Sequence, residues 1–281
     1  MKRIRLLALP ALLWLGVLFI FPMLLIVLLS FSKRGQYGQV IYQFTLGNYG
    51  RVFDPLYAGI FFDTLALAFV TTAMSLLLGY PLAYYISRLE RSAQQIWLLL
   101  VMIPFWINFL VRSYAWVIIL RSQGVVNTLL LSLGWIDEPL PLLYNNGSVL
   151  LGMVYTLLPF MVLPVYVSLE QMDRRKLEAA YDLGATPLKA FWHVTLPLTH
   201  TGVVTGSILV FVSSIGMFVV PDVMGGAKSA LIGNVIQNQF LSARDWPFGS
   251  ALSIVLILLS MLLIYLYFRA TRLPGREEGA V

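Results

Sequence analysis

The chain contains no cysteine, only two histidines and few charged residues. Without cysteine it can form no disulfide, iron–sulfur cluster or thiolate zinc site. Neither an HExxH motif nor a GxxxxGK(S/T) phosphate loop occurs, so no metal site is expected and any nucleotide is handled by another chain. Charged residues make up 11% of the chain, against roughly 25% in an ordinary soluble domain.

Apolar residues make up 59% of the chain. A soluble core cannot bury so many of them, whereas a lipid bilayer accepts an apolar exterior. A transmembrane helix needs about 20 mostly apolar residues. The sequence therefore predicts an all-α integral membrane protein whose single domain, 1–281, has six transmembrane helices. They cover approximately Leu6–Phe31, Ile60–Ser87, Ile96–Leu120, Ser148–Leu169, Gly202–Val220 and Phe248–Phe268.

Lys and Arg favour the cytoplasmic side of membrane proteins. With the N-terminus in the cytoplasm, twelve of the 19 Lys and Arg residues fall on that side, which predicts that both termini are cytoplasmic. The first apolar stretch is longer than the roughly 7–15-residue core of a signal peptide, so we expect it to remain as an anchor. The net charge of +6 reflects this loop bias, and no nucleic acid partner is expected. Two outer apolar runs, Gly124–Gly134 and Ala227–Leu241, are too short to span.

The longest cytoplasmic loop, 170–200, carries signals for two short helices joined by a glycine elbow. A capping residue and a left-handed glycine bound the first helix, and a cap, a first-turn proline and a terminating Leu-Pro pair bound the second. These residues are Asp173, Gly184, Thr186, Pro187 and Leu196-Pro197. Two angled helices on the inner face of the membrane would present a rigid knob to a soluble partner.

In the same loop, Glu178-Ala179-Ala180, Gly184 and Val194-x-Leu196-Pro197 resemble the EAA loop of ABC importer permeases, with valine in place of the usual isoleucine. Further stretches resemble the spermidine/putrescine importer permeases, and the first of that system's two permeases more than the second. These stretches are Asp54-Pro55-Leu56-Tyr57, Ile103–Trp106, Asp222–Lys228, Leu231–Ile236 and Arg244–Gly249.

The resemblance implies a type I ABC importer permease fold in a bacterial inner membrane. It implies that Glu178, Ala179, Ala180, Gly184, Leu196 and Pro197 couple the chain to an ATPase. The implied partners are membrane lipid, a second homologous permease, two ATPase subunits that bind ATP and Mg, and an extracytoplasmic solute-binding protein. The chain itself would need no cofactor and would be a transport subunit, not an enzyme.

A polyamine cargo needs carboxylates and aromatic faces, which attract ammonium groups. The candidate pathway residues are Asp222, Asp63, Trp106, Asn108, Tyr114 and Tyr155. Arg112 lies within the third predicted span, so it should face the helix bundle or a wet cavity, or snorkel outward. Asp63 and Asp222, near outer span ends, are its candidate partners. An ion pair or aromatic core that only fixes helix packing explains the same residues, and both interpretations stay open.

Two other functions are compatible with parts of the sequence. An ABC permease for another organic cation or for ferric ion would carry the same EAA loop. A secondary transporter driven by an ion gradient predicts ionisable residues at mid-span and inverted repeats. The predicted spans hold no acid at mid-span, and no repeat is visible. A membrane scaffold explains the apolar spans but not the spacing of the EAA loop.

Overall fold

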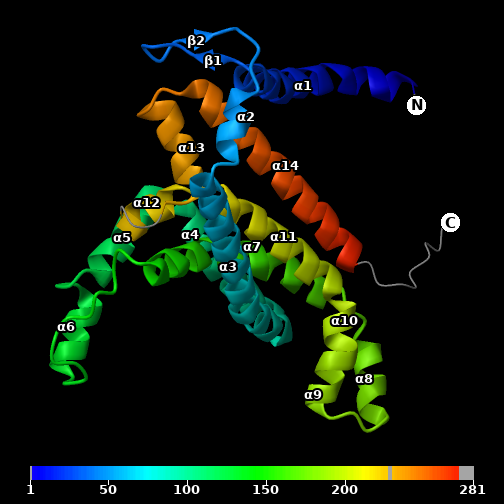
Figure 1. Cartoon of the computed structure of the whole chain (residues 1–281). Helices are drawn as coiled ribbons and strands as arrows, with labels where there is room; N and C mark the ends of the chain where they lie inside the picture. The colour runs from blue at the N-terminus through cyan, green and yellow to red at the C-terminus, as the bar shows by residue number, and fades with distance from the viewer. Residues whose placement is uncertain (1, 227–229, 272–281) are drawn as a thin grey trace. The chain divides into compact units, whose positions relative to one another are not determined.

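The computed structural model describes residues 2–226 and 230–271, with side chains described for 14–226 and 230–269. Most of the described backbone is helical, as the sequence predicted (Figure 1). The stretches Asp222–Lys228 and Ala227–Leu241 each include residues outside the described range, and so does the predicted cytoplasmic C-terminus.

Several helices are suited to a membrane. Among the described residues, four segments are long and apolar enough to cross one: Pro55–Arg88, Phe109–Ser132, Asn146–Glu170 and Trp246–Arg269. A fifth candidate is Pro187–Leu198 followed by His200–Ile215, with a 67° bend between the two parts. Helix α1 (Lys2–Ser30) is also apolar, and most of its described side chains are exposed. The chain is therefore a multi-pass membrane protein.

Contacts divide the chain into two units. One holds residues 1–61 and 232–263, and the other holds residues 62–231 and 264–281. Besides α1, the first unit contains a small antiparallel hairpin and three helices: β1 (Lys33–Arg34), β2 (Val40–Ile41), α2 (Gly47–Val52), α13 (Ile232–Leu241) and most of α14 (Trp246–Thr271).

The first unit is built on the N-terminal end of α14. Phe248 and Leu252 are fully buried in a cluster with Ile232 of α13. Directly before α14, the buried Asp245 carboxylate accepts from Arg51 Nη1 at 2.9 Å and from the Phe248 backbone N–H at 3.2 Å. The carboxylate therefore caps α14 and ties it to α2, because one group satisfies a helix N-terminus and a cation together.

The second unit contains α3 (Pro55–Arg88) from Phe62 onward and the helices of the central chain. These are α4 (Arg91–Trp106), α5 (Phe109–Leu120), α6 (Val125–Ser132), α7 (Asn146–Glu170), α8 (Arg174–Asp182), α9 (Pro187–Ala190), a π-helical turn η1 (Phe191–Thr195), α10 (Leu196–Leu198), α11 (His200–Ile215) and α12 (Val219–Gly225). Helix α7 packs most extensively against α11, and its buried Leu157, Met161 and Val165 form a core with Tyr80 and Ile86 of α3.

The third predicted span, Ile96–Leu120, is wrong as a single helix. Helix α4 ends at Trp106, Ile107 is extended, and Asn108 starts α5 by accepting a hydrogen bond from the Leu110 backbone N–H at 2.9 Å. The break leaves the Pro104 carbonyl without the helical donor four residues later. Arg112 Nη1 donates to that carbonyl at 2.7 Å instead, which satisfies a group that would be costly to leave unpaired in an apolar layer.

The fifth predicted span, Gly202–Val220, is also interrupted. Helix α11 ends at Ile215, and α12 begins at Val219 after the break at Gly216. Pro221 has no N–H to donate within a continuous helix, but this group is not needed in the first turn of a new one. The predicted span is therefore two helices.

Leu196-Pro197 does not end the second loop helix, contrary to the sequence prediction. The helical backbone continues from Pro187 through Leu198. In the wider π turn, the Leu196 N–H donates to the Phe191 carbonyl five residues earlier. We attribute the uninterrupted backbone at Pro197, which lacks an N–H, to this local change of register.

The contact between α7 and α11 depends on glycines. A Cβ at Gly202 would lie 2.5 Å from the Pro164 carbonyl oxygen, and one at Gly206 would lie 2.8 Å from Met161 Sδ. Replacing Gly202 with Ala should therefore force the helices apart at a cost of about 1–3 kcal/mol. We expect the thermal unfolding temperature of the purified protein to fall by about 2–4 °C per kcal/mol.

Gly216→Ala is the matched control, because a Cβ there meets nothing within 4 Å. It should leave the unfolding temperature nearly unchanged. Equal melting temperatures for the two variants would contradict the close approach of α7 and α11.

Candidate functional site

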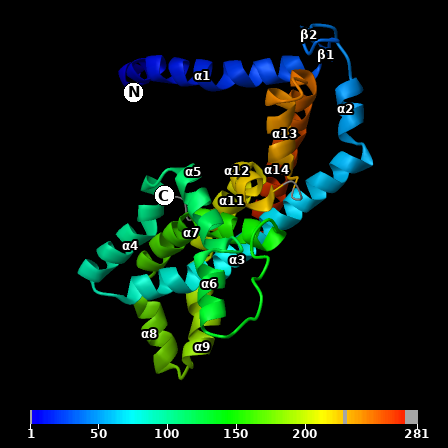
Figure 2. The ribbon, with the colours of Figure 1, turned by 90° about the vertical axis from the view of Figure 1, so that its left-hand side faces the viewer.

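Apart from the helix end predicted at Leu196-Pro197, the 170–200 loop adopts the local structure that its sequence predicted. Asp173 Oδ1 accepts from the Arg175 N–H at 3.1 Å and starts α8, while Thr186 Oγ1 accepts from the Lys189 N–H at 3.4 Å and starts α9. Between them Gly184 has φ +80°, in the left-handed region. Figure 1 and Figure 2 show α8 and α9 side by side beyond the ends of α7 and α11. The two caps and the glycine elbow are confirmed.

The loop buries one side chain of α8 and exposes the EAA residues. Leu177 is buried, whereas Glu178 and Ala179 are exposed and Ala180 is half-buried. Gly184 is also exposed, and nothing lies within 4 Å of a Cβ built on it. The exposed surface of α8 thus carries Ala179 among charged side chains, with two carboxylates, Glu178 and Asp182, and three basic residues at its start.

Leu196 and Pro197 lie away from the EAA residues. Leu196 is half-buried and packs against the core of the second unit, whereas Pro197 is exposed. The structure therefore brings Glu178, Ala179 and Ala180 together on α8 and places Gly184 at its end, with the Leu-Pro pair beyond η1, where the loop joins α11.

Polar contacts tie the loop to the ends of the long helices. Arg174 Nη2 donates to the Ser87 carbonyl at 3.3 Å, at the end of α3. The Tyr166 hydroxyl donates to Gln94 Oε1 at 3.2 Å and also contacts the Glu170 carboxylate at the end of α7. The first bond connects α8 to the end of α3, and the second connects α7 to α4 close to the start of the loop.

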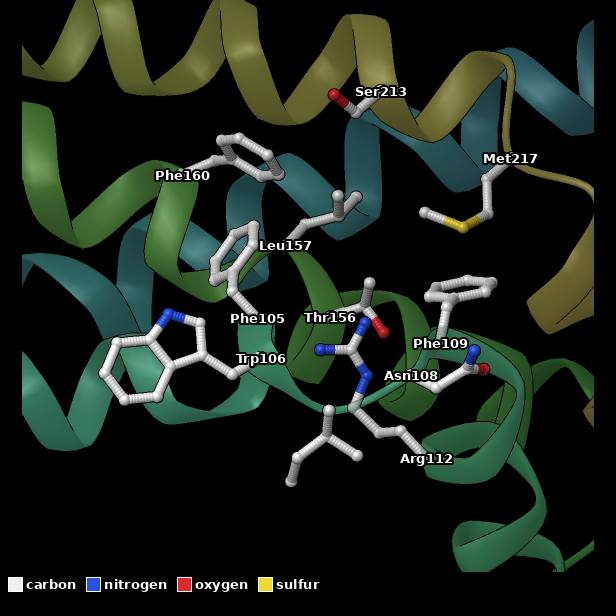
Figure 3. A pocket seen from close by; sticks show the side chains of 11 residues that line it. Phe105, Trp106, Asn108, Phe109, Arg112, Thr156, Leu157, Phe160, Ser213 and Met217 are labelled. Atoms are coloured by element: carbon white, nitrogen blue, oxygen red, sulfur yellow. The ribbon is translucent and has the colours of Figure 1, made fainter.

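A second candidate site is a pocket of about 440 Å³ between the broken α4–α5 segment, α7 and α11. Figure 3 shows it with the side chains that line it. The lining residues are Phe105, Trp106, Ile107, Asn108, Phe109, Arg112, Thr156, Leu157, Phe160, Ser213 and Met217. The break at Ile107–Asn108 opens this space, because a continuous helix would carry its own side chains through it.

Arg112 provides the charge of the pocket. The residue is 9% exposed, and its guanidinium lies 5.3 Å from the centre of the Phe109 ring and 5.8 Å from that of Tyr155. The expected partnership with Asp63 or Asp222 is wrong. Among the described residues, ion pairs join only Arg34 and Arg51 to Asp245. Asp63 and Asp222 are both exposed.

The six proposed pathway residues do not form one site. Trp106 and Asn108 line the pocket. The Tyr155 ring lies 5.8 Å from the Arg112 guanidinium. It also packs edge-on against Trp116, with 5.4 Å between the ring centres. Tyr114 is exposed on α5 and, like the two aspartates, is not part of the pocket wall.

Sequence reasoning missed Thr156 and Ser213, the two hydroxyls in the pocket wall. Both lie in long apolar helices, where isolated Thr and Ser are common and carry no functional signal. The break at Ile107–Asn108 alone puts them opposite Arg112, and that break is invisible in the hydropathy.

A family model described as "Binding-protein-dependent transport system inner membrane component" matches residues 4–273. The chain belongs to this family of transport permeases, and it is a transport subunit and not an enzyme.

Two relatives show which kind of permease the chain resembles. Over 265 residues the chain is 46% identical to the spermidine/putrescine transport system permease protein PotB of Escherichia coli strain K12, covering 94% of this chain and 96% of that protein. PotB of Haemophilus influenzae is 42% identical, with 94% and 92% covered. The resemblance to the polyamine permeases is confirmed.

A solved structure shares the fold. It is a bacterial ABC transporter involved in the import of the acidic polysaccharide alginate, with a TM-score of 0.76. The match covers 98% of this chain and 96% of that chain at 15% identity. At this identity the likeness concerns the fold alone, which is that of an ABC importer permease.

The cap on α5 can be tested at Asn108. Asn108→Ala removes the acceptor for the Leu110 N–H, so it should lower the stability of the folded protein by roughly 1 kcal/mol. Asn108→Asp keeps an acceptor oxygen and should retain parent-like stability. Thermal melts in one detergent provide the comparison, and equal losses for both variants would count against the cap.

Proposed function

We propose that this chain is one of two permease subunits of an ATP-driven importer that carries spermidine, putrescine or a close analogue across the bacterial inner membrane. The observation that carries the proposal is the 46% identity to the spermidine/putrescine permease PotB over 94% of this chain. A relationship at that level over nearly the whole length supports a shared cargo class as well as a shared fold.

We assign six spans, with cytoplasmic termini, to α1, α3, the α4–α5 pair, α7, α11 and α14. In this assignment α4 and α5 cross the membrane as one broken span. The charge pattern supports the orientation, because the N-terminal segment and the α8–α9 loop are both rich in Lys and Arg, and four of the assigned spans separate them along the chain.

The coupling loop would dock on one of two ATPase subunits through the exposed surface of α8. Closure of the ATPase pair on ATP would pull α8 together with its counterpart on a second, homologous permease. The bond from Arg174 to Ser87 offers a direct link from α8 to α3, and the bond from Tyr166 to Gln94 joins α7 to α4. The spans would then switch from inward-open to outward-open and receive solute from a binding protein.

Competition for uptake tests the cargo. In membrane vesicles or cells that contain the whole transport system, excess spermidine or putrescine should suppress uptake of labelled polyamine, while an unrelated amino acid at the same concentration should not. If neither polyamine competes, the cargo assignment is wrong, although the permease family would stand.

Gly184→Val tests the coupling elbow. A β-branched residue in the left-handed region costs roughly 1–2 kcal/mol, and Gly184 has open space around it, so the strain comes from the backbone alone. We expect uptake to fall about tenfold. Less of the ATPase subunit, or none, should co-purify with the variant.

Two variants make this result specific. Gly184→Asn tolerates positive φ and should restore much of the uptake. Gly134 has φ +67° and equally open surroundings in a loop far along the chain, so Gly134→Val imposes the same strain away from α8. Loss of uptake in the Gly134 variant to the same degree would show that strain in general, and not the elbow, is responsible.

A further inference from the structure

Arg112 carries a charge that the described chain does not balance. A guanidinium stays protonated in proteins, and a buried charge without a counter-charge is costly. Arg112 nevertheless lies nine-tenths buried in an apolar segment, with no carboxylate among the described residues paired to it. Its counter-charge must then come from outside this part of the chain.

The guanidinium is only partly satisfied by what surrounds it. Nη1 donates to the Pro104 carbonyl, and two aromatic faces lie near the group. Nε is buried and has no hydrogen-bond partner within the described residues. A guanidinium has five N–H donors in a fixed plane, so an edge of this one remains available for a planar acceptor.

The pocket next to Arg112 offers further donors and no acid. Thr156 and Ser213 contribute hydroxyls, and the amide of Asn108 has an NH₂ end besides the oxygen that caps α5. None of the eleven lining residues is Asp or Glu. Figure 3 shows the guanidinium pointing into the pocket toward Thr156.

We propose that Arg112 and this pocket form a carboxylate-binding site. A carboxylate accepts two parallel bonds from a guanidinium and takes further bonds from hydroxyl and amide donors. Two sources supply this chemistry: the acidic side chain of a second permease subunit that reaches into the pocket, or a free carboxylate from solution. A polyamine does not fit the site directly, because its charge has the same sign as that of Arg112.

The binding test uses acetate as the probe and does not involve transport. The full chain is purified in detergent without other subunits, and its unfolding temperature is measured in potassium acetate and in potassium chloride of equal ionic strength. Acetate at about ten times its dissociation constant should raise the unfolding temperature by roughly 2–5 °C over chloride. Acetamide has the same shape without the charge and should give no shift.

Two variants test whether the acetate shift arises at the pocket. Arg112→Gln should abolish the acetate shift, whereas Arg121→Gln, at an exposed arginine that caps the other end of α5, should keep it. If Arg112→Gln does not fold, Thr156→Val serves in its place, because it removes a hydroxyl and leaves the charge; it should at least halve the shift. A shift that is absent in the parent, equal for acetamide, or retained in both pocket variants overturns the proposal.

The assembled transporter distinguishes the two sources. If a side chain of the second permease fills the site, acetate should stabilise the isolated chain but not the complex. If the ligand is a free carboxylate, the shift should persist in the complex. Either result supports the site, and because neither depends on uptake, failure of this proposal leaves the polyamine assignment untouched.

Discussion

Every backbone N–H and carbonyl in a membrane interior needs a partner within the protein, and this requirement governs the second unit. Its apolar helices break or change register at several places, and at three of them a particular bond supplies the missing partner. Arg112 donates to the Pro104 carbonyl where α4 ends. The π turn lets the Leu196 N–H reach Phe191. At the end of α12, the Met224 carbonyl accepts from the Tyr144 N–H and from the Ser148 hydroxyl.

These three places are also where the molecule carries its functional candidates. The first break opens the pocket, the register change sits between the coupling loop and α11, and the third joins α12 to the start of α7. A continuous helix resists bending, whereas an interrupted helix that is held by a few hydrogen bonds can rearrange at the junction. The alternating access proposed above would use such junctions, and the long helices α3 and α7 would be the rigid parts between them.

The sequence predicted those features that depend on a few neighbouring residues. The caps at Asp173 and Thr186 and the left-handed Gly184 follow from local chemistry, so they were found correctly. The break at Ile107–Asn108 was not predicted, because an apolar stretch has the same hydropathy whether its helix is continuous or interrupted. The pairing of Arg112 with Asp63 or Asp222 failed for a related reason: sequence shows which charges exist, but the nearest acceptor was a carbonyl that the break had exposed.

If polyamines pass the pocket, as the proposed function implies, the fixed positive charge of Arg112 has to be neutralised. At 4 Å, two unit charges interact by about 4 kcal/mol at an effective dielectric constant of 20, so a bare arginine would hold an ammonium group out of the cavity. A carboxylate bound to Arg112 removes most of that repulsion and leaves a wall of aromatic rings and hydroxyls. Such a wall attracts ammonium groups weakly, through ring faces and hydroxyl oxygens. Weak attraction suits a transit path, because a cargo that binds tightly inside the membrane would not leave it.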